Sequence, residues 1–389
     1  MTKPIKIAVI GCGRVAQHYK KILDSGVVSN WKIVGFFDLI SERSNSFATH
    51  FDTKAFDSFD EMLKASRPDL VLILTPSGLH YQHTKTALEH NCNVLVEKPV
   101  TMLPNQAIEL EKIAKSKELM YGVAFQNRLN PAIRALERAI KQKRFGKIVT
   151  ATIRLRWCRY QDYYEDGWHG TWAQDGGVIN QQAIHHVDAI NWLLGPIDSL
   201  TSTITNRLNN LEAEDTLVAI MKFENGALGT IEATTAARPE DFEASLSVVG
   251  EKGMVLIGGI ALNKVETWEF VESTAEDDTV AEQYSQDVET GYGVSHGPLL
   301  QNIINSLLKG DIEPPVSALD AVQTACMVHA LYRRSWPVPL QHMSQLHNDL
   351  PVHPMKNLQS QLWLLQYHGI HQLLLPLHAI FFLETCFLY

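Results

Sequence analysis

Short apolar runs alternate with amphipathic stretches through the first third of the chain. The apolar runs are rich in Val, Ile and Leu and nearly continuous: Lys6–Ile10, Lys32–Phe37, Leu70–Leu74, Val94–Val96 and Met120–Phe125. The stretches between them have helical spacing: Val15–Ser25, Glu42–Phe51, Ser58–Ala65, His80–His90 and Leu103–Ser116. Strands of this kind that alternate with helices predict a parallel sheet covered on both faces. Residues 1–125 are therefore predicted to form a doubly wound α/β domain.

The pattern changes after residue 125. Further helices are expected at Pro131–Gln142, Ile184–Leu194, Pro298–Leu308 and Ala318–Arg333. Further strands are expected at Lys147–Trp157, Thr216–Phe223, Leu228–Thr234, Ala244–Val249 and Met254–Ile257. The Asn225-Gly226 pair and the Gly-Glu-Lys-Gly turn at 250–253 predict two successive hairpins. Residues 126–336 are thus expected to form an α+β domain with a large, mostly antiparallel sheet.

The segment 337–389 differs from the rest of the chain. It holds six histidines but only three acidic or basic residues, Asp349, Lys356 and Glu384. Its most apolar stretch, Leu373–Leu383, is interrupted by a proline and is too short to span a bilayer. We expect this tail to be poorly ordered, and we assign it no function.

Composition and charge indicate the broad class of protein. A chain of 389 residues, 45% apolar and 20% charged, is typical of a soluble protein with two domains. The net charge of -9 argues against a nucleic-acid partner, because binding to a phosphate backbone needs a basic face. An anionic small substrate needs only a few local cations and remains compatible with that charge.

The cysteines and the apolar segments indicate the compartment. The five cysteines are scattered, without a CxxC pair or a Cys/His ligand spacing, so we expect reduced thiols and no metal site. The apolar run Ile5–Ile10 is too short for a signal peptide, and no segment before residue 337 is long enough to cross a membrane. A cytoplasmic protein without a membrane partner is expected.

A glycine motif follows the first predicted strand and opens the first predicted helix. Residues 11–16 read Gly-Cys-Gly-Arg-Val-Ala, the GxGxxA pattern of a Rossmann dinucleotide site. Gly11 permits a tight turn, Gly13 lets the backbone approach a pyrophosphate, and Ala16 permits close helix–strand packing. A purely structural glycine turn is the alternative for this motif taken alone. The cofactor contacts assigned to it are Gly11, Gly13, Arg14, Val15 and Ala16.

The second strand ends at Asp38, where a carboxylate that binds a ribose hydroxyl is expected. An acidic side chain there accepts from the 2′-hydroxyl and repels a 2′-phosphate, which favours NAD over NADP. The nearby Arg43 argues in the other direction. A helix-cap or turn role for Asp38 is the alternative.

The ends of the next strands carry further polar residues. Ligands bind outside the carboxyl ends of parallel strands, so this edge of the sheet is the expected cofactor cleft. Lys98 in Glu97-Lys98-Pro99 could hydrogen-bond a substrate hydroxyl and stabilise an alkoxide, and the proline after it could adopt a cis bond. An ordinary surface lysine is the alternative, as is a helix-start role for His80. The cofactor contacts assigned at these strand ends are Thr75, Pro76, His80, Glu97, Lys98 and Gln126.

The second domain contains a helix led by Gly176-Gly177. Gln181 and His185 are four residues apart and share a helix face, and His185 and Asp188 are close enough in sequence to meet. Histidine is the side chain whose pKa suits proton exchange with a hydroxyl near neutral pH. Taken alone, a helical histidine is more often structural.

These motifs occur together in one order and spacing. The Gly11–Ala16 turn, Glu97-Lys98-Pro99 and the block Gly176…His185…Asp188…Gly195 resemble the glucose–fructose oxidoreductase/inositol dehydrogenase (Gfo/Idh/MocA) family. Gly250-Glu251-Lys252-Gly253 and the His296…Asn302 stretch fit as well, so the resemblance covers residues 4–336. It implies an NAD-dependent enzyme with Lys98 and His185 as the catalytic pair, although it leaves open which of the two is the base.

One departure indicates a branch of that family. Many members have aspartate where this chain has Gln181, and a neutral amide is better suited to substrate contact than to proton exchange. With Gln126-Asn127-Arg128 and the Arg- and aromatic-rich segment 156–172, the chain resembles the enzymes that oxidise the C3 hydroxyl of UDP-2-acetamido-2-deoxy-D-glucuronate in lipopolysaccharide synthesis. That resemblance implies a homotetramer assembled through the second-domain sheet, and cofactor recycling by 2-oxoglutarate.

The residues of this segment suit such a substrate. Guanidinium groups bind carboxylates and pyrophosphates, and aromatic side chains offer flat surfaces to a sugar or uracil. Packing within a strand or an interface is the alternative for each. The substrate contacts assigned are Lys98, Arg156, Arg159, Gln161, Tyr163, Trp168, Thr171, Gln181 and His185. Two other functions compete: a dehydrogenase of inositol or another simple sugar, and a non-catalytic dinucleotide-binding regulator, which the presence of both Lys98 and His185 disfavours.

Overall fold

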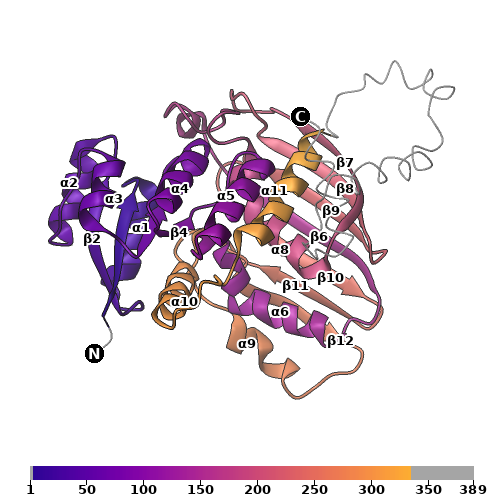
Figure 1. Ribbon diagram of the computed structural model, residues 1–389. Helices are drawn as coiled ribbons and strands as arrows, with labels where there is room; N and C mark the ends of the chain where they lie inside the picture. Colours follow the sequence, from indigo (N-terminus) through magenta and orange to yellow (C-terminus); the bar gives the residue numbers. More distant parts are fainter. Residues whose placement is uncertain (1–2, 334–389) are drawn as a thin grey trace, which may run out of the picture.

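The computed structural model describes residues 3–333, which form two sheets with helices packed against them (Figure 1). The first sheet is parallel and has five strands in the order β2-β1-β3-β4-β5. Its strands are β1 Ile5–Ile10, β2 Trp31–Phe37, β3 Leu70–Ile73, β4 Asn93–Val96 and β5 Tyr121–Val123. Each coincides with one of the predicted apolar runs. The predicted doubly wound sheet is confirmed.

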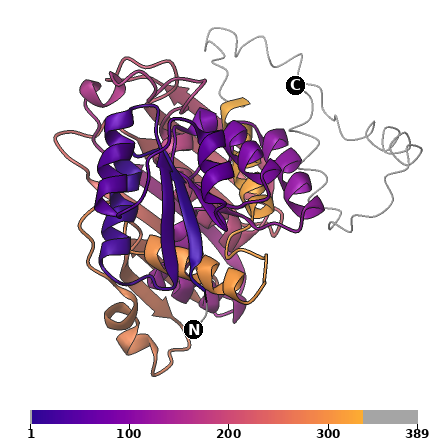
Figure 2. The same ribbon diagram turned by 60° about the vertical axis from the view of Figure 1, so that its left-hand side comes forward.

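Helices cover both faces of the five-stranded sheet, as its fully buried strands β3 and β5 require. Five of them follow the strands in sequence: α1 Arg14–Asp24, α2 Ser41–His50, α3 Phe59–Ser66, α4 His80–Glu89 and α5 Pro104–Ser116. A sixth comes from far along the chain, because α10 (His296–Leu308) packs against α1 and β1 (Figure 2). Leu299 and Ile303 of α10 are completely buried in this layer. The carboxyl-terminal part of the described chain thus completes the core of the first sheet.

The second sheet has seven strands in the order β12-β11-β10-β6-β9-β8-β7. Every neighbouring pair is antiparallel except β6 and β9, which are parallel, and this confirms the predicted large, mostly antiparallel sheet. The strands are β6 Ile148–Arg156, β7 Ile197–Thr205, β8 Thr216–Phe223, β9 Leu228–Thr234, β10 Glu243–Gly250, β11 Gly253–Gly258 and β12 Lys264–Phe270. The two edge strands, β7 and β12, were not predicted.

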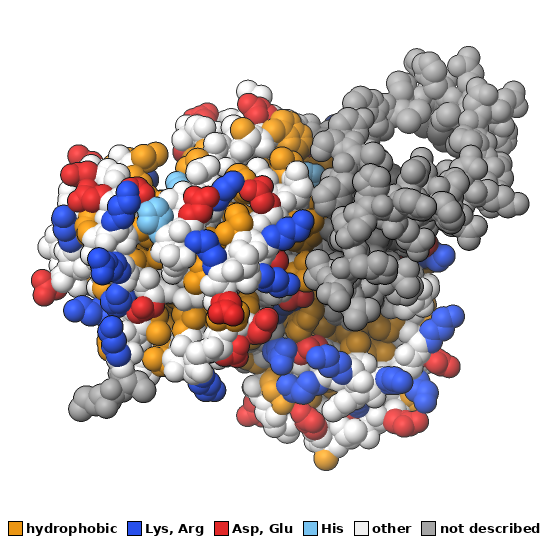
Figure 3. Space-filling view, viewed as in Figure 1, with side chains coloured by type: hydrophobic (Ala, Val, Ile, Leu, Met, Phe, Trp, Pro, Cys, Tyr) orange, Lys and Arg blue, Asp and Glu red, His pale blue; other side chains and the backbone are white. Residues whose placement is uncertain are grey.

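Helices cover one face of the seven-stranded sheet (Figure 1). They are α6 Pro131–Lys141, α7 Val178–Gln181, α8 Ile184–Leu194, α9 Val280–Tyr284 and α11 Ala318–Arg333. Alternate residues on the opposite face, among them Val218, Ile220 and Leu228, are more than half exposed. Acidic and basic side chains are interspersed over the part of the surface coloured by type in Figure 3. Of the described helices, none is both long and apolar enough to pass through a bilayer. The tail at 337–389 lies outside the described residues.

The two sheets meet through one continuous hydrophobic core. Residues on the α4–α5 face of the first sheet, such as Val71 and Val96, belong to the same buried cluster as Ile153 and Ile231 of the second. The polypeptide crosses between the sheets at the short helical turn η2 (Gln126–Leu129), directly after β5. The carboxyl ends of β4 and β5 are thereby held beside α7 and α8, and this junction contains the candidate site.

Candidate active site

The glycine turn after β1 has the geometry of a dinucleotide-binding loop. Gly11 has a positive φ of 89°, and a Cβ there would lie 2.6 Å from the carbonyl oxygen of Leu74, so only glycine fits. A Cβ at Gly13 would meet no described atom within 4 Å, which leaves open space beside the backbone. Helix α1 begins at Arg14 without a side-chain cap or an acidic residue in its first turn. Free N–H groups and open space together fit a pyrophosphate.

Asp38 ties the end of β2 to this turn. Its carboxylate accepts from the backbone N–H of Cys12 at 2.7 Å and from that of Ile40 at 2.8 Å. Asp38 therefore stabilises the turn, which was the alternative to a role in binding the ribose. A carboxylate has about four acceptor positions, so two remain for a ribose hydroxyl at the expected place.

His80 does not occupy the position predicted for it. Its side chain is 1% exposed, and its ring nitrogens lie 2.7 Å from the carbonyl oxygen of Pro99 and 2.9 Å from that of Thr75. Burial lowers the pKa of this imidazole, and a neutral ring donates to one of the two carbonyl oxygens at a time. The ring lies between the loops after β3 and β4, so the predicted cofactor contact is corrected to a role in bracing these loops. Pro76 precedes the short turn η1 (Ser77–Leu79), and the Thr75 hydroxyl lies 3.0 Å from Nδ1 of His83.

Glu97 is buried beneath the same edge of the sheet. Its carboxylate accepts from the Tyr19 hydroxyl at 3.1 Å and lies 3.6 Å from Nε2 of His296. The neighbouring donors and the Lys98 charge hold the pKa of this carboxyl below its usual value despite its burial. Tyr19 belongs to α1 and His296 to α10, so Glu97 links both helices to the loop that carries Lys98.

Lys98 follows β4 and precedes a cis peptide bond to Pro99, as the sequence suggested. Its Nζ donates to the backbone carbonyl oxygen of Gln181 at 2.8 Å and to the side-chain Oε1 of the same residue. Burial lowers the pKa of this amine, and Glu97 and Asp175 oppose that shift. Lys98 from the first sheet and Gln181 from α7 are thus brought together.

His185 lies at the start of α8, close to the same junction. Its Nε2 lies 3.5 Å from Nε2 of Gln126, and its ring meets the edge of Phe125 at a centroid distance of 5.9 Å. Desolvation, and then the nearby Lys98 charge, lower the pKa of this imidazole well below its usual value. A neutral imidazole that is partly exposed, as His185 is, can accept a proton.

Asp188 does not pair with His185, contrary to the spacing argument. Its carboxylate is bound in bidentate fashion by Arg128, with nitrogen–oxygen distances of 2.7 and 2.8 Å, and accepts from Thr324 at 2.9 Å. All three side chains are buried. This ion pair fastens α8 to η2 and α11, so it holds the helix of His185 beside the end of β5.

The sequence interpretation missed Asp175, although it directly precedes the Gly176-Gly177 pair. Its side chain is 1% exposed and accepts from Nε2 of Gln181 and, at 2.8 Å, from the backbone N–H of Gly170. Burial raises the pKa of this carboxyl to about 7. Asp175, Gln181 and Lys98 therefore form one hydrogen-bonded series.

Arg156 is not brought to this junction. It projects from β6 on the face opposite the buried Ile153 and Leu155, and it forms ion pairs with Glu232 at 2.7 Å and Glu243 at 2.9 Å. Its guanidinium is occupied by two carboxylates on the face of the sheet away from the helices. The predicted substrate contact of Arg156 is corrected to an ion pair across three strands.

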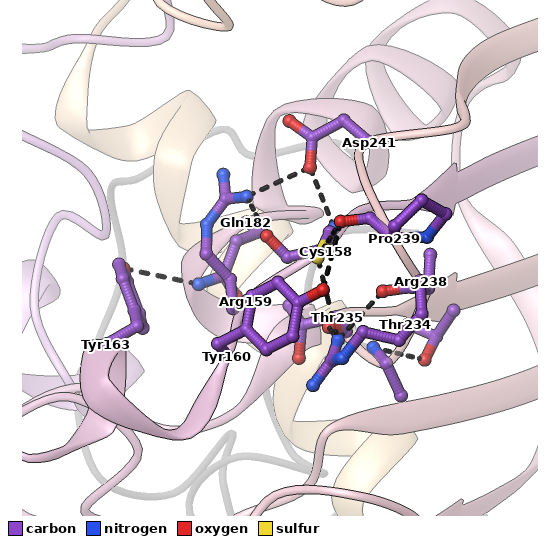
Figure 4. A network of polar contacts seen from close by, with 12 residues as sticks. Cys158, Arg159, Tyr160, Tyr163, Gln182, Thr234, Thr235, Arg238, Pro239 and Asp241 are labelled. Atoms are coloured by element: carbon purple, nitrogen blue, oxygen red, sulfur yellow. Dashed lines mark hydrogen bonds and ion pairs between the residues drawn. The ribbon is translucent and has the colours of Figure 1, made fainter.

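Arg159 and Tyr163 are seen together with Gln182, the residue after Gln181 (Figure 4). The Arg159 guanidinium donates to Asp241 at 3.0 Å, and its carbon lies 5.7 Å from the centre of the Tyr163 ring. The Tyr163 hydroxyl accepts from Nε2 of Gln182 at 3.4 Å, one residue after Gln181. Figure 4 shows Arg159 turned toward Asp241 while Tyr163 reaches the Gln182 amide.

The remaining predicted substrate contacts belong to the loop after β6. Gln161 exchanges two hydrogen bonds with the backbone of Asn210, at 2.8 and 3.1 Å. The Thr171 hydroxyl donates to the carbonyl oxygen of Trp168 at 2.8 Å, and the Trp168 ring packs on His169. The polar side-chain groups of Gln161 and Thr171 thus stabilise the loop itself.

This loop also contacts the glycine turn after β1 and the turn after β3. The Arg14 guanidinium carbon lies 5.2 Å from the centre of the Tyr163 ring, and the N–H of Gly78 donates to the carbonyl oxygen of Gln174 at 3.0 Å. Contacts with both the α1 and η1 turns bring the segment 157–176 over the carboxyl edge of the five-stranded sheet.

The fold and the junction define a class of protein. A Rossmann turn, a carboxylate at the end of β2, and a lysine and a neutral imidazole at the same sheet edge are the parts of a dinucleotide-dependent oxidoreductase. The amine can stabilise an alkoxide while the imidazole accepts a proton.

Comparison with known proteins identifies the family. Residues 5–125 match the GFO_IDH_MocA oxidoreductase family with the NAD-binding Rossmann fold, and residues 133–256 match the GFO/IDH/MocA C-terminal domain. The chain therefore belongs to the Gfo/Idh/MocA family, and it is an NAD-dependent oxidoreductase. The expected family, enzyme class and cofactor are confirmed.

The chain is similar to three proteins of known activity or structure. The WlbA dehydrogenase from Bordetella pertussis, solved with NADH and UDP-GlcNAcA, is 30% identical with a TM-score of 0.80, over 87% of this chain and 99% of that one. The D-glucoside 3-dehydrogenase of Escherichia coli (strain K12) is 26% identical over 64% of this chain and 76% of its own length. The scyllo-inositol 2-dehydrogenase (NAD(+)) of Bacillus subtilis (strain 168) is 25% identical over 66% and 75%.

Proposed function

We propose that the chain oxidises the C3 hydroxyl of UDP-2-acetamido-2-deoxy-D-glucuronate to the 3-keto sugar, as a step in making a lipopolysaccharide sugar. The main support is the likeness to the WlbA dehydrogenase solved with UDP-GlcNAcA, which extends over 99% of that chain. The segment 157–176 adds chemical support, because it places Arg159 and the Tyr163 ring beside Arg14 of the glycine turn. Guanidinium and aromatic groups suit an anionic nucleotide sugar better than an uncharged polyol.

The chain's own residues would perform the reaction as follows. Bound NAD supplies the acceptor for the hydride that leaves C3. His185, whose imidazole is neutral, takes the hydroxyl proton on a ring nitrogen. Lys98 donates to the same oxygen and stabilises its developing negative charge. In the second mechanism the two roles are exchanged, with Lys98 as the base.

The assay that tests this proposal is the formation of NADH, followed at 340 nm with purified full-length chain. UDP-2-acetamido-2-deoxy-D-glucuronate is compared with inositol at equal concentrations, with and without 2-oxoglutarate. We expect the nucleotide sugar acid to give a kcat/KM at least about 100-fold higher, because inositol has no anionic group for a guanidinium and no base to stack on the aromatic side chains of segment 157–176. NMR of the product should show a carbonyl at C3. Equal or faster oxidation of inositol would favour the inositol-type activity of the scyllo-inositol relative.

We also propose that the seven-stranded sheet forms the subunit interface of a homotetramer. Its face away from the helices exposes Val218, Ile220, Leu228 and Met254, which lie on three different strands. Val218, Ile220 and Leu228 lie on the neighbouring strands β8 and β9, and exposed apolar groups of this kind mark association surfaces. Light scattering on the wild type and on Ile220→Asp tests it. We expect a tetramer for the former and a smaller species for the latter, and a monomeric wild type would contradict it.

A further inference from the structure

The candidate site contains a buried carboxylate that the proposed mechanism does not use. We infer that Asp175 is a positioning residue for Lys98: it orients the Gln181 amide so that the oxygen of that amide, and not its nitrogen, faces the ammonium group. This inference rests on the proposed role of Lys98 in the oxidation.

The hydrogen bonds fix the orientation of the amide. A primary amide has a donor end and an acceptor end, whereas a carboxylate only accepts. Gln181 donates from Nε2 to Oδ1 of Asp175 and accepts from Nζ of Lys98 on Oε1. The second carboxylate oxygen, Oδ2, accepts from the backbone N–H of Gly170 at 2.8 Å, which holds the acid in place. A flipped amide would set two hydrogen-bond donors against each other at Lys98.

The arrangement leaves one donor of Lys98 for the substrate. An ammonium group has three N–H donors. Within residues 3–333, the hydrogen bonds of Lys98 Nζ are those to the carbonyl oxygen and to Oε1 of Gln181. The third N–H remains for the oxygen of the sugar hydroxyl.

Asp175 also supplies the charge that Lys98 needs in a buried place. Desolvation favours the neutral amine, and the negative charges of Glu97 and Asp175 oppose that effect. Asp175 is 1% exposed and Gln181 is 9% exposed, so water screens the interaction little. The other titratable groups that interact with the Asp175 charge are Asp166, Tyr163, Tyr164, Glu214 and Tyr332.

The first test is Asp175→Asn. The new amide oxygen can still accept from Gly170, but its nitrogen would face Nε2 of Gln181, and Gln181 would have to turn its own nitrogen toward Lys98. We expect kcat to fall about 100-fold or more, the loss typical of a misplaced catalytic donor, while NADH binding measured by fluorescence is unchanged. Asp162→Asn, an exposed acid in the same loop, is the matched control and should retain wild-type turnover.

The second test moves the negative charge from residue 175 to residue 181. In the double variant Asp175→Asn/Gln181→Glu, the side chain at 175 donates to the carboxylate at 181, which accepts from Lys98, so every hydrogen bond of the series is retained. We expect kcat to recover to within about 10-fold of wild type, since a carboxylate again neutralises the ammonium. A folded, NADH-binding double variant no more active than Asp175→Asn would overturn the inference.

A pH profile separates positioning from a merely structural role. Because burial raises the pKa of Asp175 to about 7, its carboxylate gains a proton as the pH falls through neutrality, and kcat of the wild type should fall with it. The double variant should lack this limb near pH 7.

Lys98→Met is measured in parallel, with whichever sugar the wild type oxidises fastest. An active Lys98→Met variant would refute the proposed catalytic pair. An inactive Lys98→Met variant beside an Asp175→Asn variant with more than half of wild-type kcat would refute the positioning role alone.

Discussion

The ammonium of Lys98, at the carboxyl end of β4, donates to the backbone carbonyl oxygen of Gln181 at 2.8 Å. The two residues are 83 positions apart: Lys98 follows β4 of the first sheet, and Gln181 ends α7, which packs on the second sheet. This bond, with the second one to Oε1 of Gln181, fixes the amine at the junction where the Rossmann edge meets α7 and α8. The fold therefore holds the Lys98 amine in a defined position at this junction.

Replacing Lys98 with methionine should lower kcat by about 10³-fold or more, because the side chain keeps its length but loses every donor to the reacting oxygen. NAD binding should persist, since the glycine turn and Asp38 are untouched. Stopped-flow measurement of NADH formation, with NADH affinity from fluorescence, checks both parts. Lys85→Met, which removes a lysine paired with Glu109 on α5, is the control and should behave as wild type. Near-normal turnover by Lys98→Met would refute the catalytic assignment.

His185→Gln should lower kcat about 10²- to 10⁴-fold, the usual contribution of a positioned acid–base group. Because burial and the Lys98 charge depress the pKa of this imidazole, His185 is neutral well below pH 7 in the wild type. Its protonation should therefore appear only as a further loss of rate at acidic pH. His90→Gln, at a site beside Asp60, is the control and should have the kcat of the wild type. A wild-type kcat in the His185→Gln variant would leave Lys98 as the only candidate base.

The elements that the sequence predicted best are those whose pattern is local. β8 and β9 were predicted to the residue, because Asn225-Gly226 marks the hairpin between two alternating runs. β7 and β12 were missed because edge strands are half-exposed. β7, for example, reads Ile-Asp-Ser-Leu-Thr-Ser-Thr-Ile-Thr, with polar residues at most positions. Edge strands of that composition resemble loops until a neighbour is known.

Errors at the site came from contacts that no local pattern encodes. Asp188 was expected near His185, but its partner is Arg128, 60 positions away. Arg156 was expected at the substrate, although the alternation of β6 already placed it opposite Ile153 and Leu155. The two-residue period of a strand thus places Arg156 on the face away from the helices. Asp175 had only its place before two glycines to mark it.

Asp38→Ala should weaken the preference for NAD over NADP. The substitution removes the negative charge that repels a 2′-phosphate, and we expect the ratio of kcat/KM for NAD to that for NADP to fall at least about 10-fold. Stability should fall as well, because Cys12 and Ile40 lose the acceptor for their N–H groups. Steady-state kinetics with both cofactors checks the ratio, and Asp57→Ala, an exposed acid beyond α2, is the control. An unchanged ratio would assign Asp38 a purely structural role.

The protonation of Glu214 should make the free energy of unfolding depend on pH. Its buried carboxylate accepts from the N–H of Ile179 at 3.0 Å and from the Tyr332 hydroxyl at 3.2 Å, and its other oxygen has no hydrogen-bond partner among residues 3–333. Burial raises the pKa of this carboxyl from 4.5 to about 8. Between those values the unfolded chain has released the proton and the folded chain still holds it. The stabilisation that this proton provides is therefore complete below pH 4.5 and is lost as the pH rises to 8.

Glu214→Gln should remove that dependence. The amide is nearly isosteric, and its oxygen can accept from Ile179 and Tyr332 at any pH. From pH 5 to 8, the free energy of unfolding of the wild type should fall relative to the variant by up to about 1 kcal/mol per pH unit. Urea denaturation of both proteins at several pH values measures the difference. Glu212→Gln is the control, because this neighbouring acid accepts from the backbone N–H of Trp172 on the surface of the protein. Parallel pH curves for wild type and Glu214→Gln would show that Glu214 is ionised in the folded protein, and its burial would then have to be compensated by the donors that surround it.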